Sequence, residues 1–176
     1  MGTSLKILMV EDSADDAELI ARTLRRGGCD PIYHRVETAE AMRAALARTR
    51  WDLVIADYSM PLFSALAALK LLREKEPDLP FILVSGTVGE EVAVQAMRAG
   101  ANDYVMKHSL LRLWPAIQRE LADAETRRAH RQAESRYHVL FNSVPVGVLV
   151  TTPDGRVLEA NPTFVKMLSL GHGESF

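Results

Sequence analysis

The sequence has little of several features that mark whole classes of protein. Its 176 residues include one cysteine, Cys29, so an intrachain disulfide and a metal site built from several cysteines are both excluded. No apolar run approaches the roughly 20 residues that span a bilayer, and the first residues lack the long apolar stretch of a signal peptide. We therefore expect a cytoplasmic location and no membrane contact for this segment.

An excess of positive charge is also lacking. The 21 Lys and Arg residues against 23 Asp and Glu residues give a formal net charge of −2, and no basic stripe stands out. Proteins that bind duplex nucleic acid usually carry such a stripe, and no helix-turn-helix pattern follows residues 1–122. We therefore expect no nucleic-acid partner.

Short apolar runs alternate with segments of helical period through the first two thirds of the chain. Five runs are expected to form strands: residues 5–10, 31–36, 53–56, 81–84 and 104–106. The second contains Pro31, His34 and Arg35, which favours an edge strand. Strands that alternate with helices predict an α/β fold with a doubly wound five-stranded parallel sheet, in which ligands bind beyond the carboxyl ends of the strands.

The chain changes character after about Ser109. Residues 116–140 contain no Gly or Pro and are rich in Ala, Glu, Arg and Gln, which predicts one long helix that Pro115 kinks or restarts. An interrupted apolar seam allows a short, imperfect coiled coil in a helical linker over residues 123–140. A homodimer through this helix is a further expectation.

A small α+β unit is expected after the long helix. Residues 146–151 and 156–160 flank the turn at residues 153–155, which predicts a β-hairpin, and Asn161 followed by proline is typical of a helix start. The chain ends before such a unit could close a core. We therefore interpret residues 141–176 as the N-terminal fragment of a domain.

Polar residues stand at the ends of four predicted strands. Glu11 and Asp12 follow the first strand, Asp57 the third, Ser85 the fourth and Lys107 the fifth. The carboxyl ends of parallel strands share one edge of a sheet, so we expect these side chains to converge. Neighbouring carboxylates raise each other's pKa, and a hard divalent cation such as Mg²⁺ relieves that repulsion. With a hydroxyl and an ammonium group nearby, the set offers what phosphoryl transfer requires.

Each of these residues by itself has an ordinary explanation. An acidic residue after a strand commonly caps a helix, and we interpret Asp15 and Asp16 in that way. A lone lysine such as Lys107 is usually solvated, and a serine before glycine, such as Ser85, is usually a turn residue. The arrangement of five such residues at four strand ends is what favours a site.

Four segments have the order and spacing of a known family. They are Ile-Leu-Met-Val-Glu11-Asp12, Leu-Val-Ile-Ala-Asp57-Tyr-Ser-Met-Pro61, Ile-Leu-Val-Ser85-Gly-Thr and Ala-Gly-Ala-Asn-Asp-Tyr104-Val-Met-Lys107. On these segments the chain resembles the receiver domain of two-component response regulators. The resemblance implies a flavodoxin-like receiver domain over residues 1–122.

The resemblance also implies a chemical role for the acidic residues. Asp57 would accept a phosphoryl group from a partner histidine kinase or histidine phosphotransfer protein. Glu11 and Asp12 would bind Mg²⁺ together with Asp57 and the backbone carbonyl of Ser59. Similar aspartyl-phosphate hydrolases commonly carry a second Asp where Ser59 stands here, so we expect no enzyme turnover beyond self-dephosphorylation.

The remaining matched residues would act on the phosphoryl group. Ser85 would hydrogen-bond it, Lys107 would pair with it, and Tyr104 would be the aromatic switch residue. The family often has a cis proline after the lysine. Here His108 follows, and we expect a trans bond and a solvent-facing side chain, because a cis bond would cost about 2.5–4 kcal/mol. The family also often has glycine where Ala65 stands. The resemblance therefore does not predict the backbone conformation between Pro61 and the third helix.

Residues 141–176 resemble the beginning of a PAS sensor domain. The segments Phe141-Asn-Ser-Val-Pro-Val-Gly-Val, Asp154-Gly155 and Glu159-Ala-Asn161-Pro-Thr-Phe carry this resemblance. It implies a switch whose phosphorylation is relayed through the long helix to a PAS-containing output. Two alternatives stay open: a phosphorylation-independent interaction or dimerisation module, and the receiver part of a hybrid sensor histidine kinase, with a histidine kinase as the full-length parent.

Overall fold

A computed structural model describes residues 3–86 and 90–171 of the chain. The chain divides into two compact units, Met1–Arg127 and Arg128–Phe176. It passes from one unit to the other within helix α5 (Leu113–Ser143). Among the described residues, no helix combines the length and the apolar character needed to cross a membrane.

The first unit is built on a parallel β-sheet. Its strands are β1 (Thr3–Val10), β2 (Cys29–Val36), β3 (Leu53–Asp57), β4 (Phe81–Ser85) and β5 (Asp103–Met106). They lie in the order β2-β1-β3-β4-β5, and every neighbouring pair is parallel. The direction of winding reverses between β1 and β3, which makes the carboxyl ends of these two strands a topological switch point. The predicted doubly wound sheet is confirmed, with β2 at an edge as expected.

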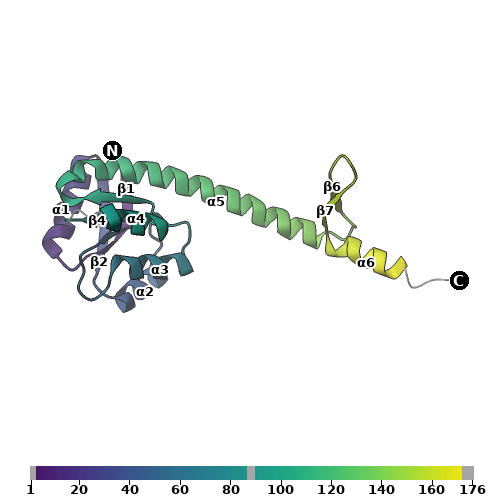
Figure 1. Ribbon diagram of the computed structural model, residues 1–176, viewed down its shortest axis with the longest axis horizontal. Coiled ribbons are helices and arrows are strands. Elements are labelled where there is room, and N and C mark those ends of the chain that lie inside the picture. Colours follow the sequence, from purple (N-terminus) through teal and green to yellow (C-terminus); the bar gives the residue numbers. More distant parts are fainter. Residues whose placement is uncertain (1–2, 87–89, 172–176) are drawn as a thin grey trace. The chain divides into compact units, whose positions relative to one another are not determined.

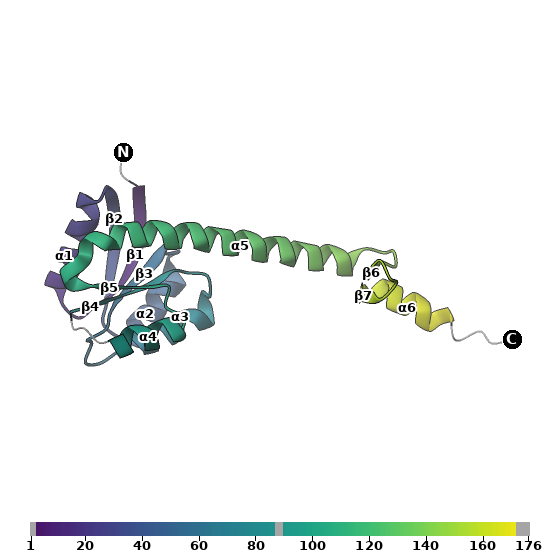
Figure 2. The ribbon, with the colours of Figure 1, turned by 45° about the horizontal axis from the view of Figure 1, so that its top comes forward.

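Helices cover both faces of this sheet. Helix α1 (Ala14–Arg26) and the first turns of α5 pack on one face (Figure 1). Helices α2 (Ala39–Arg48), α3 (Ala65–Lys75) and α4 (Glu90–Arg98) lie on the other face (Figure 2). A six-residue 3-10 helix, η1 (Lys107–Arg112), connects β5 to α5.

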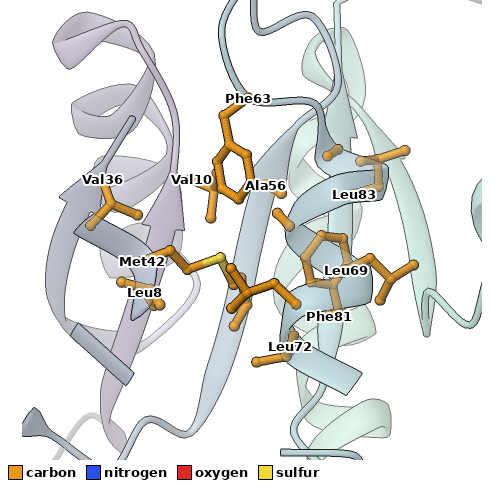
Figure 3. Packing of buried hydrophobic residues seen from close by; sticks show 14 of the residues in the cluster. Leu8, Val10, Val36, Met42, Ala56, Phe63, Leu69, Leu72, Phe81 and Leu83 are labelled. Carbon is orange, nitrogen blue, oxygen red and sulfur yellow. The ribbon is translucent and has the colours of Figure 1, made fainter. Parts of the chain in front are cut away.

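Successive residues of a strand point into two different cores. In β1, Leu8 and Val10 pack with Met42 on the side of α2 and α3 (Figure 3). Ile7 and Met9 of the same strand pack on the opposite side, under α1 and α5. Because both faces of the strand are buried, its sequence is apolar at nearly every position rather than at every second one.

Helix α3 begins at the position where the family often has glycine. Ser64 precedes it in an extended conformation, and its hydroxyl accepts a hydrogen bond from the Ala67 amide at 3.2 Å. Ala65 itself is buried against the core. The helix therefore starts at Ala65 with an ordinary serine cap.

The predicted long helix is confirmed, and α5 extends past both of its predicted ends. Pro115 lies in the first turn, where its missing N–H removes no hydrogen bond of the helix. The backbone changes direction earlier, at Ser109 within η1, which has φ −126° and ψ 34°. The expected interruption is therefore the junction between η1 and α5, just before the proline.

The second unit contains a small antiparallel hairpin followed by a helix. Strands β6 (Leu149–Thr151) and β7 (Val157–Ala160) pair with each other, and α6 (Pro162–Gly171) follows directly. Gly155 in the connecting turn has a φ of +87°, a conformation that favours glycine. The predicted hairpin and the helix after it are confirmed, while residues 172–176 of the predicted fragment lie outside the described residues.

Asn161 holds this second unit together. Its side chain is fully buried, and its amide nitrogen donates to the carbonyls of Phe141 at 3.0 Å and Val146 at 2.8 Å. Its amide oxygen accepts from the backbone N–H groups of Val148 at 2.9 Å and Phe164 at 2.8 Å. One side chain thus joins the end of α5, the approach to β6 and the first turn of α6.

Candidate functional site

Three carboxylates meet at the carboxyl ends of β1 and β3. Glu11 and Asp12 directly follow β1, and Asp57 is the last residue of β3. Carboxylate oxygens of these three residues, hereafter the acidic cluster, all lie within 4.8 Å of one another. Glu11 and Asp57 are 2% and 5% exposed, whereas Asp12 is exposed. The structure thus brings together the three acidic residues that the sequence singled out.

Lys107 reaches the acidic cluster from the start of η1, directly after β5. Its ammonium nitrogen lies 3.1 Å from Oδ2 of Asp57 and 3.3 Å from Oε2 of Glu11, and it also forms an ion pair with Asp16. Burial alone would lower the pKa of Lys107, but the hydrogen bonds to Asp16 and Asp57 outweigh burial, so its pKa lies above the ordinary value. Lys107 is therefore a fixed positive charge in this site.

Glu11 is the carboxyl group most perturbed by this environment. Its burial, followed by the charge of Asp57, raises the pKa of Glu11 from the ordinary 4.5 to about 7. The amide of Ser13, which donates to Oε1 at 3.0 Å, and the ammonium of Lys107 offset part of this effect. Glu11 therefore exchanges its proton close to neutral pH.

One oxygen of Asp57 identifies the kind of ligand that the site can accept. Oδ1 is buried and has no hydrogen-bond partner among the described residues. A buried carboxylate oxygen without a partner is costly, and a hard cation that prefers oxygen ligands would supply one. The acidic cluster therefore fits Mg²⁺, with Glu11, Asp12 and Asp57 able to hold it. Ser59 lies in the loop two residues after Asp57, where its backbone carbonyl is a further oxygen donor.

Ser85 and Tyr104 occupy different parts of this region. Ser85 is the fully buried last residue of β4, one position beyond Val84, which is the register partner of Asp57. Tyr104 lies in the edge strand β5 and packs against the core on the side of α2 and α3. The structure therefore places Ser85 at the same sheet edge as Asp57 and places Tyr104 beside the core. Thr87 of the matched motif lies outside the described residues.

His108 is exposed in η1, and its peptide bond to Lys107 is trans, as expected. It lies in the 3-10 helix that connects β5 to α5. No described contact joins its side chain to the acidic cluster. The structure therefore gives no geometry for a relay or metal histidine at this position among the described residues.

Two contacts of the site were missed by sequence reasoning. The carboxylate of Asp16 contacts Lys107 rather than capping α1, and the capping residue is Ser13, whose hydroxyl accepts from the Asp16 amide at 3.2 Å. The interpretation of Asp15 and Asp16 holds for their place in the first turn of α1 but not for the cap itself, which Ser13 makes. The position of Asp16 in the first turn of α1, after the acidic pair, is the only sequence signal that could have indicated the contact.

Arg35 is the second missed residue. From β2 its guanidinium donates to the backbone carbonyl of Glu11 at 3.0 Å and to that of Asp12 at 2.9 Å, and it forms an ion pair with Glu37. These bonds fix the backbone of the acidic pair and leave both carboxylates free to face the site. A contact to backbone carbonyls has no signature in the sequence.

Comparison with known proteins places both parts of the chain in families. The model of the response regulator receiver domain matches residues 7–117, and the model of the PAS domain matches residues 135–175. Both resemblances that the sequence motifs indicated are therefore confirmed.

Individual relatives agree with these matches. The chain is 39% identical over 102 residues to the response regulator protein FleR of Pseudomonas aeruginosa, a stretch that covers 58% of this chain and 21% of FleR. It is 30% identical over 105 residues to a chemotaxis protein CheY homolog of Campylobacter jejuni, covering 58% of this chain and 81% of that protein.

A solved structure of a receiver domain is also similar to this chain. The signal receiver domain of a signal transduction histidine kinase from Syntrophus aciditrophicus is 27% identical, with a TM-score of 0.58, over 68% of this chain and 91% of that one. The receiver model covers residues 7–117, more than half of the 176 residues. This chain belongs to the response regulator receiver domain family.

Proposed function

We propose that the chain is a phosphoacceptor switch of a two-component system. In this proposal Asp57 receives a phosphoryl group from a phosphohistidine on a histidine kinase or a histidine phosphotransfer protein in the cytoplasm. One observation carries the proposal. The buried carboxylate of Asp57 has one oxygen 3.1 Å from the ammonium of Lys107 and the other without a hydrogen-bond partner among the described residues.

The chemical step is a displacement at phosphorus. A carboxylate oxygen of Asp57 attacks the phosphorus atom, and a phosphorus–oxygen bond forms as the phosphorus–nitrogen bond to the donor imidazole breaks. The electron pair of the broken bond stays on the imidazole nitrogen. An imidazole protonated on its other nitrogen therefore departs neutral, and an unprotonated one takes a proton from solvent as it departs. Lys107 supplies a positive charge for the phosphoryl oxygens, and the hydroxyl of Ser85 is a hydrogen-bond donor at the same sheet edge.

Magnesium is the cofactor that the acidic cluster would take. Glu11, Asp12, Asp57 and the backbone carbonyl of Ser59 would hold it. When bound, Mg²⁺ supplies positive charge that neutralises the oxygens of the transferred group. Arg35 supports this role because it fixes the carbonyls of Glu11 and Asp12 and leaves their carboxylates directed to the site.

We propose no turnover of external substrates by this chain. The residue two positions after Asp57 is Ser59, an exposed serine whose side chain does not supply the acid that hydrolysis of an external phosphate ester would need. The phosphoryl group would therefore leave only by self-dephosphorylation or by return to a partner.

The output would pass through η1 and α5. Lys107 is the first residue of η1, which leads directly into α5, and Leu110, Leu113 and Ile117 are buried against the sheet. A change in the contacts of Lys107 would therefore act on the start of α5. Tyr104, the proposed switch residue, packs on the opposite face of the sheet and would act through β5, the strand that leads into η1. The predicted helical linker at residues 123–140 and the PAS match over residues 135–175 support a relay to a PAS-containing output. Dimerisation through this helix is part of the same proposal.

A second candidate places this chain within a hybrid sensor histidine kinase. The observation that favours it is the likeness to the solved receiver domain of a signal transduction histidine kinase, together with the PAS match after the receiver. The chemistry at Asp57 is the same in both cases. Only the protein to which the receiver is joined differs.

The experiment that tests the proposal is phosphorylation by a small donor. The chain is incubated with phosphoramidate and magnesium chloride, and its intact mass is measured. We expect one phosphoryl increment, which Asp57→Asn abolishes. Asp52→Asn is the matched control, because Asp52 stands just before the opposite end of the same strand and should leave the increment intact. An unmodified wild-type chain would contradict the proposal and favour a phosphorylation-independent interaction module.

A further inference from the structure

One of the three carboxylates that bind Lys107 lies outside the acidic cluster. Asp16 belongs to α1, whereas Glu11 and Asp57 lie at strand ends. We propose that Asp16 is a positioning residue that shares Lys107 with Asp57 and Glu11, which the lysine also contacts at 3.1 and 3.3 Å. Asp16 thereby weakens the hold of Lys107 on the acidic cluster, where a cation would bind, and competes with a phosphoryl group for the lysine. The part that concerns the phosphoryl group rests on the proposed function.

The backbone of Asp16 is held in place at the start of α1. Its amide donates to the hydroxyl of Ser13 at 3.2 Å, and Ser13 in turn donates its own amide to Glu11 at 3.0 Å. The carboxylate of Asp16 also lies in the first turn of α1, where the helix dipole favours a negative charge. Asp16 is therefore a fixed anchor for the lysine rather than a mobile surface acid.

The three N–H donors of Lys107 match its three carboxylate partners. An ammonium group has three donors and no acceptor, so every new bond to a phosphoryl oxygen must replace an existing one. The side chains of Glu11 and Asp57 are 2% and 5% exposed, whereas that of Asp16 is 37% exposed. Water and salt screen the bond to Asp16 most strongly, so Lys107 releases Asp16 first when a phosphoryl group arrives.

Loss of the Asp16 charge has opposite consequences for the two ligands of the site. Without Asp16, Lys107 binds more fully to Oε2 of Glu11, the oxygen of that carboxylate that the Ser13 amide does not occupy, so Glu11 is less available to Mg²⁺ and the ion binds more weakly. A phosphoryl group on Asp57 then meets no competitor for Lys107, so the phosphorylated form is favoured once magnesium is saturating. A general folding defect would instead reduce both quantities.

Asp15 provides a matched control within the same helical turn. It carries the same charge and the same relation to the helix dipole, but it is exposed and makes no described contact with Lys107. Asp15→Asn therefore reports what the loss of one negative charge near the site does by itself. Asp16→Glu keeps the charge and should restore the behaviour of the wild-type chain.

The test compares the wild-type chain with Asp16→Asn, Asp15→Asn and Asp16→Glu. Magnesium chloride is titrated by calorimetry at low ionic strength, and the phosphorylated fraction is measured by intact mass with phosphoramidate at saturating magnesium. For Asp16→Asn we expect magnesium affinity to fall roughly two- to fivefold and the ratio of phosphorylated to unmodified chain to rise by a similar factor. Asp15→Asn and Asp16→Glu should change either quantity by less than about twofold.

Two results would overturn the proposal. One is equal magnesium affinity in Asp16→Asn and Asp15→Asn, which would reduce Asp16 to one charge among several. The other is a fall in both quantities for Asp16→Asn, which would make Asp16 a structural residue. If the wild-type chain accepts no phosphoryl group, the proposed function fails, but the magnesium titration still decides whether Asp16 positions Lys107.

Discussion

The ammonium nitrogen of Lys107 lies 3.1 Å from Oδ2 of Asp57, and this contact joins the end of β3 to the residue that follows β5. The strand β4 lies between these two strands in the sheet, so the lysine side chain crosses the end of a strand to reach its partner. It passes Gly86, where a Cβ atom would lie 3.7 Å from Cδ of the lysine. The ammonium group of Lys107 thus covers the buried carboxylates of Asp57 and Glu11 at this edge of the sheet.

Removal of the Lys107 charge should make the free energy of unfolding depend on magnesium. Lys107→Met keeps the length of the side chain but leaves the buried carboxylates of Asp57 and Glu11 without their positive partner. We expect the free energy of unfolding in EDTA to fall by roughly 1–3 kcal/mol, and magnesium to restore more stability than it adds to the wild-type chain. Urea unfolding with and without magnesium measures both effects. Lys70→Met, at an exposed position of α3, is the control and should change neither.

Glu11 should give the stability of the fold a specific pH dependence. Its pKa is raised from the ordinary 4.5 to about 7, so between these values the folded chain keeps a proton that the unfolded chain releases. Stability conferred by this group is therefore complete below pH 4.5 and falls as pH rises toward 7, by at most about 1.4 kcal/mol per pH unit. The measurement is the difference in unfolding free energy between the wild-type chain and Glu11→Gln across that range in EDTA. A difference that grows in favour of the wild-type chain as pH rises would contradict the assignment.

Magnesium should oppose this loss of stability with rising pH, because the metal binds the ionised carboxylate of Glu11. Binding at a pH below 7 should release a proton from Glu11. Calorimetric titrations in two buffers with different ionisation enthalpies measure that proton. The number released should decline as the pH passes above 7 and should be smaller in Glu11→Gln. An unchanged proton release in Glu11→Gln would assign the proton to another group.

Arg35 should support the metal site without contacting the metal. Arg35→Gln removes the guanidinium that binds the carbonyls of Glu11 and Asp12 at 3.0 and 2.9 Å. The backbone of the acidic pair then loses its clamp, and we expect magnesium affinity to fall by up to about tenfold. Arg43→Gln, at an exposed position of α2, serves as the control for the lost charge. Equal affinities of the two variants would mean that Arg35 acts only through its charge.

Asn161 should stabilise the second unit specifically. Asn161→Ala removes four hydrogen bonds, two that the side-chain amide donates and two that its oxygen accepts, and leaves the amides of Val148 and Phe164 without their partner. We expect the local opening free energy to fall by roughly 2–4 kcal/mol. Hydrogen exchange of these amides reports the change, while exchange in the sheet of the first unit should stay the same. Asn142→Ala, at an exposed position, is the matched control.

The sequence predicts those parts of the fold in which a residue type occurs in one structural environment only. Strands buried on both faces are apolar at nearly every position, so β3, β4 and most of β1 were visible as apolar runs, interrupted only by Lys6 in β1. The polar residues that end these runs, Asp57 among them, could then be assigned to one sheet edge. The convergence of Glu11, Asp12 and Asp57 follows from the parallel topology alone.

The contacts that escaped prediction depend on how elements are rotated against one another. Whether Asp16 faces solvent or Lys107 is decided by the packing of α1 on the sheet, which the local sequence does not specify. Arg35 binds backbone carbonyls, which every residue possesses, so its partners leave no trace in the sequence. Asn161 was recognisable as a helix start, but its bonds to Phe141 and Val146 require the closed second unit.

The central claim is that Asp57 itself carries the phosphoryl group. An aspartyl phosphate can be reduced with borohydride, which marks the modified residue permanently, and peptide mass spectrometry then locates the mark. After incubation with phosphoramidate and magnesium, we predict the mark on Asp57 and its loss when magnesium is removed with EDTA. A mark on Glu11 or Asp12, or a phosphoryl group found on His108 instead, would contradict the claim.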